Sequence, residues 1–212
     1  MESLGLFLVF WYGILHALGA DHLTAIADFS IGKDKRKTIL ITVLFALGHG
    51  SMLFIFAKIL ETYYIPETIL GYGDIISSTV ILTMGFYLLY MVATNKIHLQ
   101  KHIHENKEHI HIYFGKEHSH DSTTTSSFTI GALMGIGGVR GMLVTLGAIQ
   151  GQTVNMDMIL AFTAGVMLVF VGFGGVILYI NQNLLKNKQN IRRIFATTGA
   201  ISVIVGAGMF FN

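Results

Sequence analysis

The sequence has no cysteine, a single proline and few charged residues. Without cysteine it can form no disulfide, thiolate metal site or cysteine nucleophile. Aspartate, glutamate, lysine and arginine make up 12% of the 212 residues, whereas soluble domains contain about 25%. The formal net charge of +2 is too small to indicate nucleic-acid binding. Hydrophobic residues reach 52% and glycines number 24, a combination typical of membrane helices that pack through small residues.

Six apolar segments are long enough to cross a bilayer, which takes about 20 residues of helix. We therefore predict an all-α polytopic protein of the cell membrane, with six transmembrane helices surrounded by lipid. The residues before the first segment include no lysine or arginine, so we expect this segment to be retained and not cleaved as a signal peptide. The segments cover approximately residues 4–29, 38–60, 68–94, 128–150, 156–180 and 191–211.

The basic residues gather in alternate connections between these segments. Of the 14 lysines and arginines, all but Lys58 and Arg140 lie in or beside the connections that directly follow the first, third and fifth segments. Connections rich in lysine and arginine stay on the cytoplasmic side of a membrane. We therefore predict that these three connections are cytoplasmic and that both termini lie outside.

The order of three spans, a polar connection and three more spans suggests a duplication. Because each half has an odd number of spans, the halves would cross the membrane in opposite directions, as a 3+3 inverted repeat. Residues 13–22 align without gaps on residues 131–140, which matches Gly13 with Gly131. We predict a first half that carries the metal motifs, a cytoplasmic histidine-rich loop and a second half. These parts cover residues 1–94, 95–127 and 128–212.

Titratable residues inside predicted spans are candidate functional residues, because charge is costly within a bilayer. His16, Asp21 and His22 fall in the first span, and His49 falls in the second. Counted at about 1.5 Å per residue from the short loop between these spans, the three histidines lie at similar depths near mid-membrane. Imidazole and carboxylate groups without thiolate suit Ni²⁺, Co²⁺ or Zn²⁺. We predict these four residues as ligands of such an ion.

The spacing of His16 and His22 leaves two arrangements open. Six residues apart on a regular helix, they would be separated by about 9 Å along the axis and about 120° around it. They could not then hold one ion together. Either the helix breaks near Gly19, as transporter helices often do at their sites, or the two histidines serve successive positions on a path.

Three further residues are candidates for the ion pathway or for a counter-charge. Asp28 lies seven residues after Asp21, on nearly the same helix face and closer to the cytoplasm. Arg140 is the single charged residue in the fourth span, where we expect a structural role or pairing with Asp21. Met52 lies one turn from His49 and offers a soft sulfur ligand. Hydrogen bonding or packing across the bundle is the alternative role for each.

The connection of residues 95–127 holds seven of the ten histidines. Repeated His-x-His pairs with acidic neighbours are a compositional sign of metal binding. We expect a flexible loop that captures metal weakly and releases it on acidification, since protonated imidazole is no ligand. The alternative is an inert linker. The histidines are His98, His102, His104, His109, His111, His118 and His120.

Two motifs resemble those of the nickel/cobalt transporter family. His16-Ala-Leu-Gly-Ala-Asp21-His22 matches its H-x4-D-H motif, and Leu47-Gly48-His49-Gly50-Ser51 resembles its L-G-H-S motif in the next helix. The likeness covers roughly the first 60 residues and is shared with short urease-accessory-type membrane relatives. It implies a transporter in which these histidines and the aspartate select and move Ni²⁺ or Co²⁺.

The second half resembles the same family but lacks its acidic residues. Val139 stands where one family motif has an acidic residue, and Phe170 and Phe173 stand where another has two aspartates. In the internal repeat, His16, Asp21 and His22 likewise align with Met134, Val139 and Arg140, so we expect the ligand chemistry in the first half of the chain.

From these observations we expect a transporter of a divalent transition metal, with no resident cofactor and no enzymatic activity. The phosphate-binding pattern G-x-x-x-x-G-K-[ST] is absent. A negative cell interior favours cation entry by about 2.3 kcal/mol per charge per 100 mV, which favours uptake. The histidine-rich loop is similar to that of nickel/cobalt efflux permeases, so export is an alternative, as is delivery of metal to a cytoplasmic acceptor. A membrane haem protein is a less favoured alternative.

Overall fold

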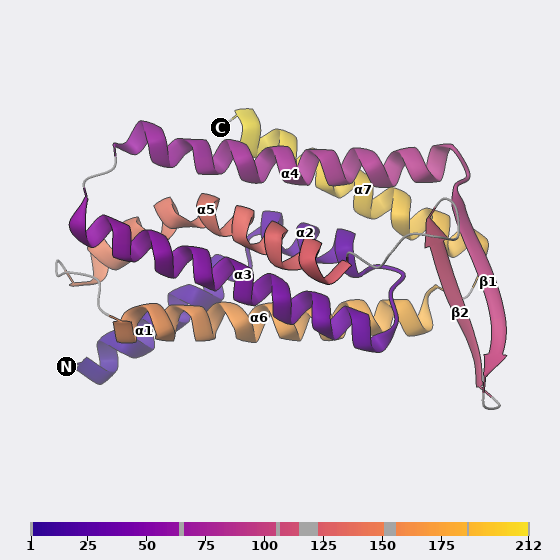
Figure 1. The fold of residues 1–212 in the computed structure, drawn as a ribbon, viewed down its shortest axis with the longest axis horizontal. Coiled ribbons are helices and arrows are strands. Elements are labelled where there is room, and N and C mark those ends of the chain that lie inside the picture. Colours follow the sequence, from indigo (N-terminus) through magenta and orange to yellow (C-terminus); the bar gives the residue numbers. More distant parts are fainter. Residues whose placement is uncertain are drawn as a thin grey trace.

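The computed structural model describes residues 2–63, 66–104, 107–114, 123–150, 156–185 and 187–211. In this part of the chain, helices make up the body and a two-stranded hairpin extends from one end (Figure 1). In chain order the elements are α1 (Glu2–Ala17), α2 (Ala20–Ser30), α3 (Lys35–Thr62), α4 (Glu67–Ala93), β1 (Ile97–His104), β2 (Lys107–Phe114), α5 (Thr123–Gln150), α6 (Met156–Asn183) and α7 (Lys188–Phe211).

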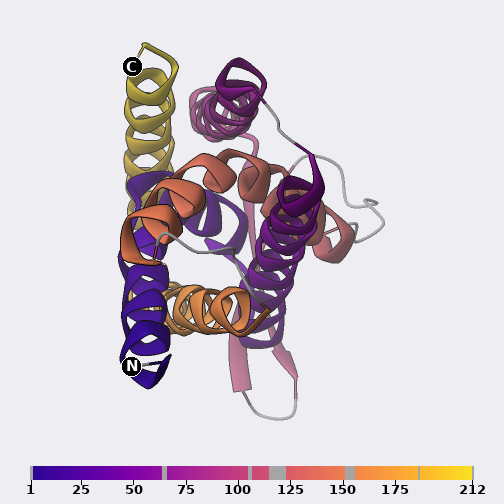
Figure 2. The same cartoon turned by 90° about the vertical axis from the view of Figure 1, so that its left-hand side faces the viewer.

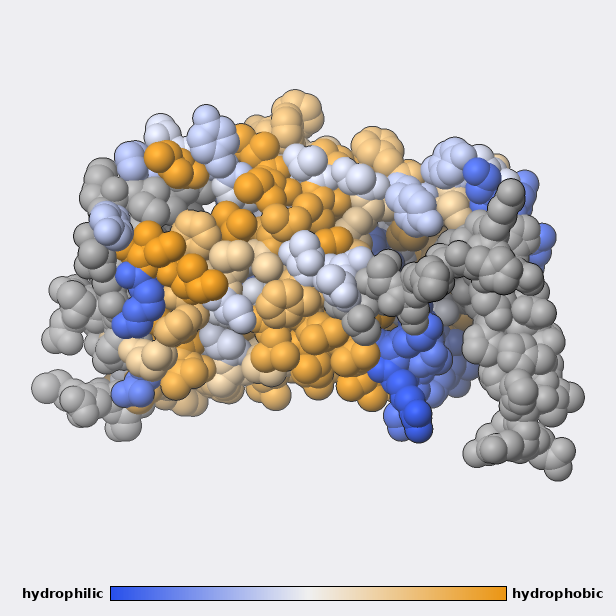
Figure 3. All heavy atoms as spheres, in the orientation of Figure 1, coloured by the Kyte–Doolittle hydropathy of each residue, from blue (hydrophilic) through white to orange (hydrophobic). Residues whose placement is uncertain are grey.

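Several helices are long and apolar enough to cross a membrane. Helices α3, α4, α6 and α7 each contain such a segment, and α1 with α2 qualifies as one broken span. Apolar side chains cover the middle of the face in Figure 3, and hydrophilic ones lie toward its ends. The predicted membrane-helix character is thereby confirmed, with four to five candidate spans among the described residues. In α5 the apolar segment found is the shorter Thr125–Val139, so the sixth span stays a prediction.

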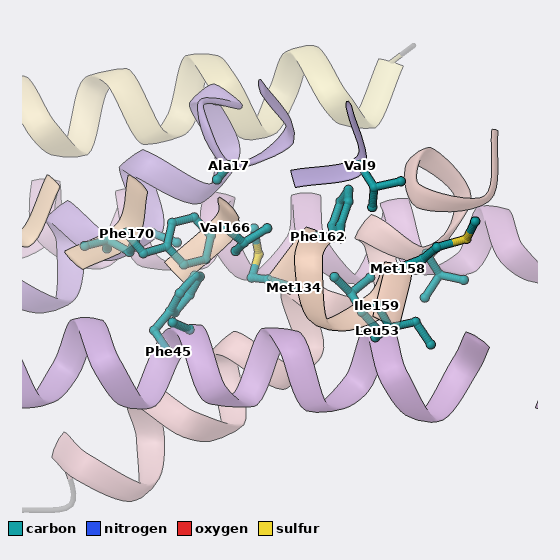
Figure 4. Packing of buried hydrophobic residues seen from close by; sticks show 14 of the residues in the cluster. Val9, Ala17, Phe45, Leu53, Met134, Met158, Ile159, Phe162, Val166 and Phe170 are labelled. Carbon is teal, nitrogen blue, oxygen red and sulfur yellow. The ribbon is translucent and has the colours of Figure 1, made fainter. Parts of the chain in front are cut away.

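The bundle has two sides when it is viewed along the helices. Helix α6 lies between α1 and α3 on one side, and α4 and α7 lie next to each other on the other (Figure 2). Buried side chains fill the space among α1, α3, α5 and α6, with Phe45, Phe162 and Phe170 as the largest (Figure 4). This core surrounds the candidate site described below.

A fixed turn joins α2 to α3. Asp34 begins α3 by accepting a hydrogen bond from the Lys37 backbone N–H at 2.9 Å, as N-terminal capping residues do. Gly32 has a positive φ of 78°, which glycine adopts without strain. The Asn181 side chain of α6 accepts from the Gly32 N–H at 2.9 Å and donates to the Ser30 carbonyl at 2.8 Å. These bonds hold the end of α2 against α6.

A Phe-x-x-Gly pattern brings α1 and α6 into close contact. Gly13 follows Phe10 by three residues in α1, and Gly165 follows Phe162 by three residues in α6. A methyl group on Gly13 would collide with the Phe162 carbonyl oxygen, and one on Gly165 would collide with the Phe10 carbonyl oxygen. The two backbones therefore approach each other where glycine leaves room, as in membrane helices generally.

The same pattern joins α3 to α5. Here Gly48 follows Phe45, and Gly131 follows Phe128, again by three residues. A methyl group on Gly131 would collide with the Phe45 carbonyl oxygen, and one on Gly48 with that of Phe128. The α3–α5 contact thus repeats the α1–α6 contact residue for residue.

The connection of residues 95–127 is partly ordered where we expected a flexible loop. Strands β1 and β2 pair in antiparallel register, with His102 opposite His109 and Gln100 opposite His111. Residues 97–103 alternate apolar and polar side chains except at Lys101, a period of two that favours a strand. His98 and His104 also lie on β1, whereas His118 and His120 lie outside the described residues.

The close α3–α5 contact predicts opposite outcomes for two glycine substitutions. Gly131→Ala should lower the free energy of unfolding by about 1–3 kcal/mol, because the methyl group overpacks a backbone contact. Gly172→Ala should leave stability unchanged or higher, since no described atom lies within 4 Å of the new methyl group and alanine favours the helix. Thermal unfolding of both variants in detergent measures the difference. Equal stability of the two variants would contradict the contact.

Candidate metal centre

The site begins at the break between α1 and α2. Helix α1 ends at Ala17 and α2 begins at Ala20, with a bend of 60° between them. A methyl group on Gly19 would lie 2.5 Å from Asp21 Oδ1 and 3.1 Å from His22 Nδ1. Only glycine therefore allows the chain to turn here without displacing these side chains. Of the two arrangements that the spacing left open, the structure has the broken helix.

The break brings His16 and His22 together, and α3 adds His49. The ring centroids of His16 and His22 are 4.7 Å apart, and those of His22 and His49 are 4.8 Å apart. His16 Nε2 and His49 Nε2 lie 3.3 Å from each other. Two nitrogens bound tetrahedrally at about 2.0–2.1 Å from one ion would be separated by about 3.3 Å. One nitrogen from each ring lies within 4.8 Å of the other two, a geometry that can hold a metal ion.

Asp21 orients one of these rings. Its Oδ1 lies 2.8 Å from His22 Nδ1, which donates to the carboxylate. His22 is 3% exposed, and its Nε2 atom is buried without a hydrogen-bond partner among the described residues. Metal-binding histidines are typically held in this way, with the second ring nitrogen on a carboxylate. Asp21 thus reaches the cluster through His22, whereas the sequence predicted it as a ligand itself.

Aromatic side chains surround the three imidazoles. The ring centroid of Phe162 is 5.3 Å from that of His16, and Phe170 lies 5.7 Å from both His22 and His49. His49 is fully buried, with Phe45 stacked on it. These rings form apolar walls beside the imidazoles, and Asp21 is the one carboxylate bonded to the cluster among the described residues.

Sequence reasoning missed Gly138, which closes the site from α5. A methyl group on Gly138 would lie 3.0 Å from His16 Nε2 and 3.2 Å from His49 Cε1. Gly135, one turn earlier, likewise lies against the His49 carbonyl oxygen. In the sequence, residues 131–140 align with residues 13–22 and Arg140 is singled out, but the glycines are not connected with the histidines. The three glycines, at positions 135, 137 and 138, were the signal that a second helix approaches the histidines closely.

Asp28 and Met52, predicted for the ion pathway or a counter-charge, are not members of the three-histidine cluster. Asp28 accepts hydrogen bonds from the Ser202 hydroxyl of α7, at 2.9 Å and 2.8 Å to its two oxygens. Met52 lies at the α3–α5 interface, where its Cβ would be 3.0 Å from a methyl group on Gly135. Arg140 belongs to α5, but its side chain is outside the described part, as are those of the hairpin histidines.

Comparisons with known proteins add no relative. Protein-family models, curated proteins and solved structures were each searched, and none matches this chain.

The hydrogen bond between Asp21 and His22 predicts a role for the carboxylate in metal affinity. Asp21→Asn should weaken Ni²⁺ binding about 10- to 100-fold, as is usual when such a partner is lost. Asp157→Asn is the matched control, since Asp157 is exposed in the first turn of α6. Calorimetric titration with Ni²⁺ measures both, in protein whose seven histidines between residues 98 and 120 are replaced by glutamine. An unchanged affinity in Asp21→Asn would contradict this role.

Proposed function

We propose that this protein transports a divalent transition-metal cation across a membrane, with Ni²⁺ or Co²⁺ as the expected cargo and uptake as the expected direction. The observation that carries the proposal is the cluster of partly buried His16 with buried His22 and His49 at a helix break. A polar cluster of this kind inside an apolar bundle is energetically costly and therefore rare, so it is a candidate functional site by default. The resemblance of residues 16–22 and 47–51 to nickel/cobalt transporter motifs supports the same cargo.

The chemistry of the cluster suits an ion that must enter and leave. Three neutral imidazoles bind borderline divalent ions such as Ni²⁺ and Co²⁺ without a thiolate that would hold them more tightly. The Asp21 carboxylate, bonded to His22, offsets part of the ion's charge in the low-dielectric interior. Because His16 and His22 lie on opposite sides of the break, a change in the angle between α1 and α2 would separate the ligands and release the ion.

The packing of the phenylalanines argues against the haem alternative. Phe162 and Phe170 lie directly against the imidazole rings at centroid distances of 5.3–5.7 Å. A porphyrin is much wider than a single ion and would need this space. The site therefore favours a bare cation over a macrocycle.

We also propose six spans arranged as an inverted repeat, with α1 and α2 as the first and α5 as the fourth. The repeated Phe-x-x-Gly contacts support this arrangement, because α1–α6 and α3–α5 are the pairs that a two-fold repeat would exchange. The basic connections then face the cytoplasm, and both termini lie outside.

In this repeat the metal cluster belongs to the first half alone. The alignment that matches Gly13 with Gly131 places Met134 at the position of His16 and Val139 at that of Asp21. Met134 and Val139 are both buried among apolar side chains. Apolar side chains therefore stand at the positions where a twin site in the second half would need ligands.

The hairpin is proposed as a cytoplasmic capture site for the same ion. Its register places His102 opposite His109, and opposed residues of antiparallel strands lie about 4.5–5.5 Å apart. Such a site can pass metal to or from the bundle. It also keeps open a second function, the delivery of metal to a cytoplasmic acceptor protein.

Accumulation of radioactive Ni²⁺ by cells tests the proposal. Cells that express the wild type should accumulate more nickel than cells without the protein, whereas His16→Ala and His49→Ala should return uptake to background, because each removes a ligand. A variant with the seven histidines of residues 98–120 replaced by glutamine should keep part of the uptake. Membrane levels of each variant serve as the control for expression.

Two outcomes would contradict the proposal. Equal accumulation by the wild type, His16→Ala and His49→Ala would remove the buried histidines from transport. Accumulation below that of cells without the protein would assign export and overturn the proposed direction.

A further inference from the structure

An apolar groove runs along the outside of the bundle, with α2 as its floor and α6 and α7 as its walls. Its volume is about 520 Å³, within the range of about 300–1,000 Å³ that ligand sites occupy. The lining is almost entirely carbon. It includes Leu23 and Ala27 of α2, Ile177 of α6, and Ile194 and Ile201 of α7.

The groove opens toward the surroundings of the bundle. Leu184 and Ile201, which line it, are each 45% exposed. Ile201 belongs to α7 and Leu184 directly follows α6, and both helices are candidate spans, so these side chains would face a bilayer. The neighbouring medium is therefore hydrocarbon, and a hydrocarbon chain is the ligand that this lining can accept.

One end of the groove is basic. Among the described residues, Arg193 is the one charged residue in its lining, and it lies in the second turn of α7. The α2–α3 turn, with basic residues between positions 33 and 37, lies at the same end, because Asn181 of α6 binds its backbone. Thr197 and Thr198 add hydroxyl groups one turn along from Arg193. Basic pockets between membrane helices on the cytoplasmic side bind anionic lipid headgroups.

We propose that this α2–α6–α7 groove binds an anionic phospholipid, with one acyl chain along the apolar lining and the phosphate on Arg193. The chain would contact Leu23 and Ala27, on the half-helix that carries His22. The bound lipid would thereby support the short α2 at the break. This inference requires a membrane-embedded bundle but does not depend on metal transport.

Thermal unfolding of the purified full-length protein in detergent tests the headgroup. Phosphatidylglycerol should raise the Tm of the wild type by several degrees more than phosphatidylcholine with the same acyl chains. Arg193→Gln should abolish this difference. Arg192→Gln is the matched control and should preserve it, because the Arg192 guanidinium donates to Asn95 and does not line the groove. Equal stabilisation by both lipids, or an undiminished difference in Arg193→Gln, would overturn the proposal.

Native mass spectrometry tests the acyl-chain part. Wild type should retain one phosphatidylglycerol molecule, whereas Ile201→Trp should not, because the indole would fill the groove. Ile204→Trp should retain the lipid, since Ile204 is 72% exposed and lies outside the lining. Two other results would overturn the assignment. One is that inorganic phosphate alone raises the Tm as much as phosphatidylglycerol does. The other is that the wild type binds a second protein copy in place of the lipid and that Ile201→Trp prevents this.

Discussion

The approach of three imidazoles depends on the two-residue break between α1 and α2. A continuous helix would hold His16 and His22 about 9 Å apart along its axis, whereas the break places their ring centroids 4.7 Å apart. Gly19 makes the break possible because a side chain there would meet Asp21 and the His22 ring. The same residue therefore sets the backbone path and leaves room for the hydrogen bond that orients His22.

Close backbone packing holds the partners of this broken helix in place. The Phe-x-x-Gly contacts fix α1 against α6 and α3 against α5, and they thereby position His16 and His49 from two different helices. Gly138 then lets α5 lie directly on these rings. Because a packed interior resists small changes in volume, the positions of the histidines are determined mainly by glycines that make no contact with an ion.

The apolar candidate spans and the histidines that cluster could be predicted from the sequence because both depend on composition within one segment. Apolar runs of about 20 residues mark spans, and histidines within them are rare enough to be noticed. The sequence could not decide between a helix break at Gly19 and a regular helix, because the reason for glycine there is the position of the Asp21 side chain, which only the structure gives. The roles of Gly138 and of the Phe-x-x-Gly patterns were missed because they depend on which helices pack against each other, and the sequence of a single segment does not show this. The hairpin was missed because the histidine content of this connection predicts metal binding, whereas the strand is indicated by the alternation of apolar and polar residues.

X-ray absorption at the nickel edge tests the buried three-histidine site most directly. The protein would be loaded with one equivalent of Ni²⁺ after the seven histidines of residues 98–120 are replaced by glutamine, so that the described cluster supplies the remaining imidazoles. The predicted spectrum has three imidazole ligands, and two in His22→Gln. A spectrum with oxygen ligands alone, or one that His22→Gln leaves unchanged, would contradict the site.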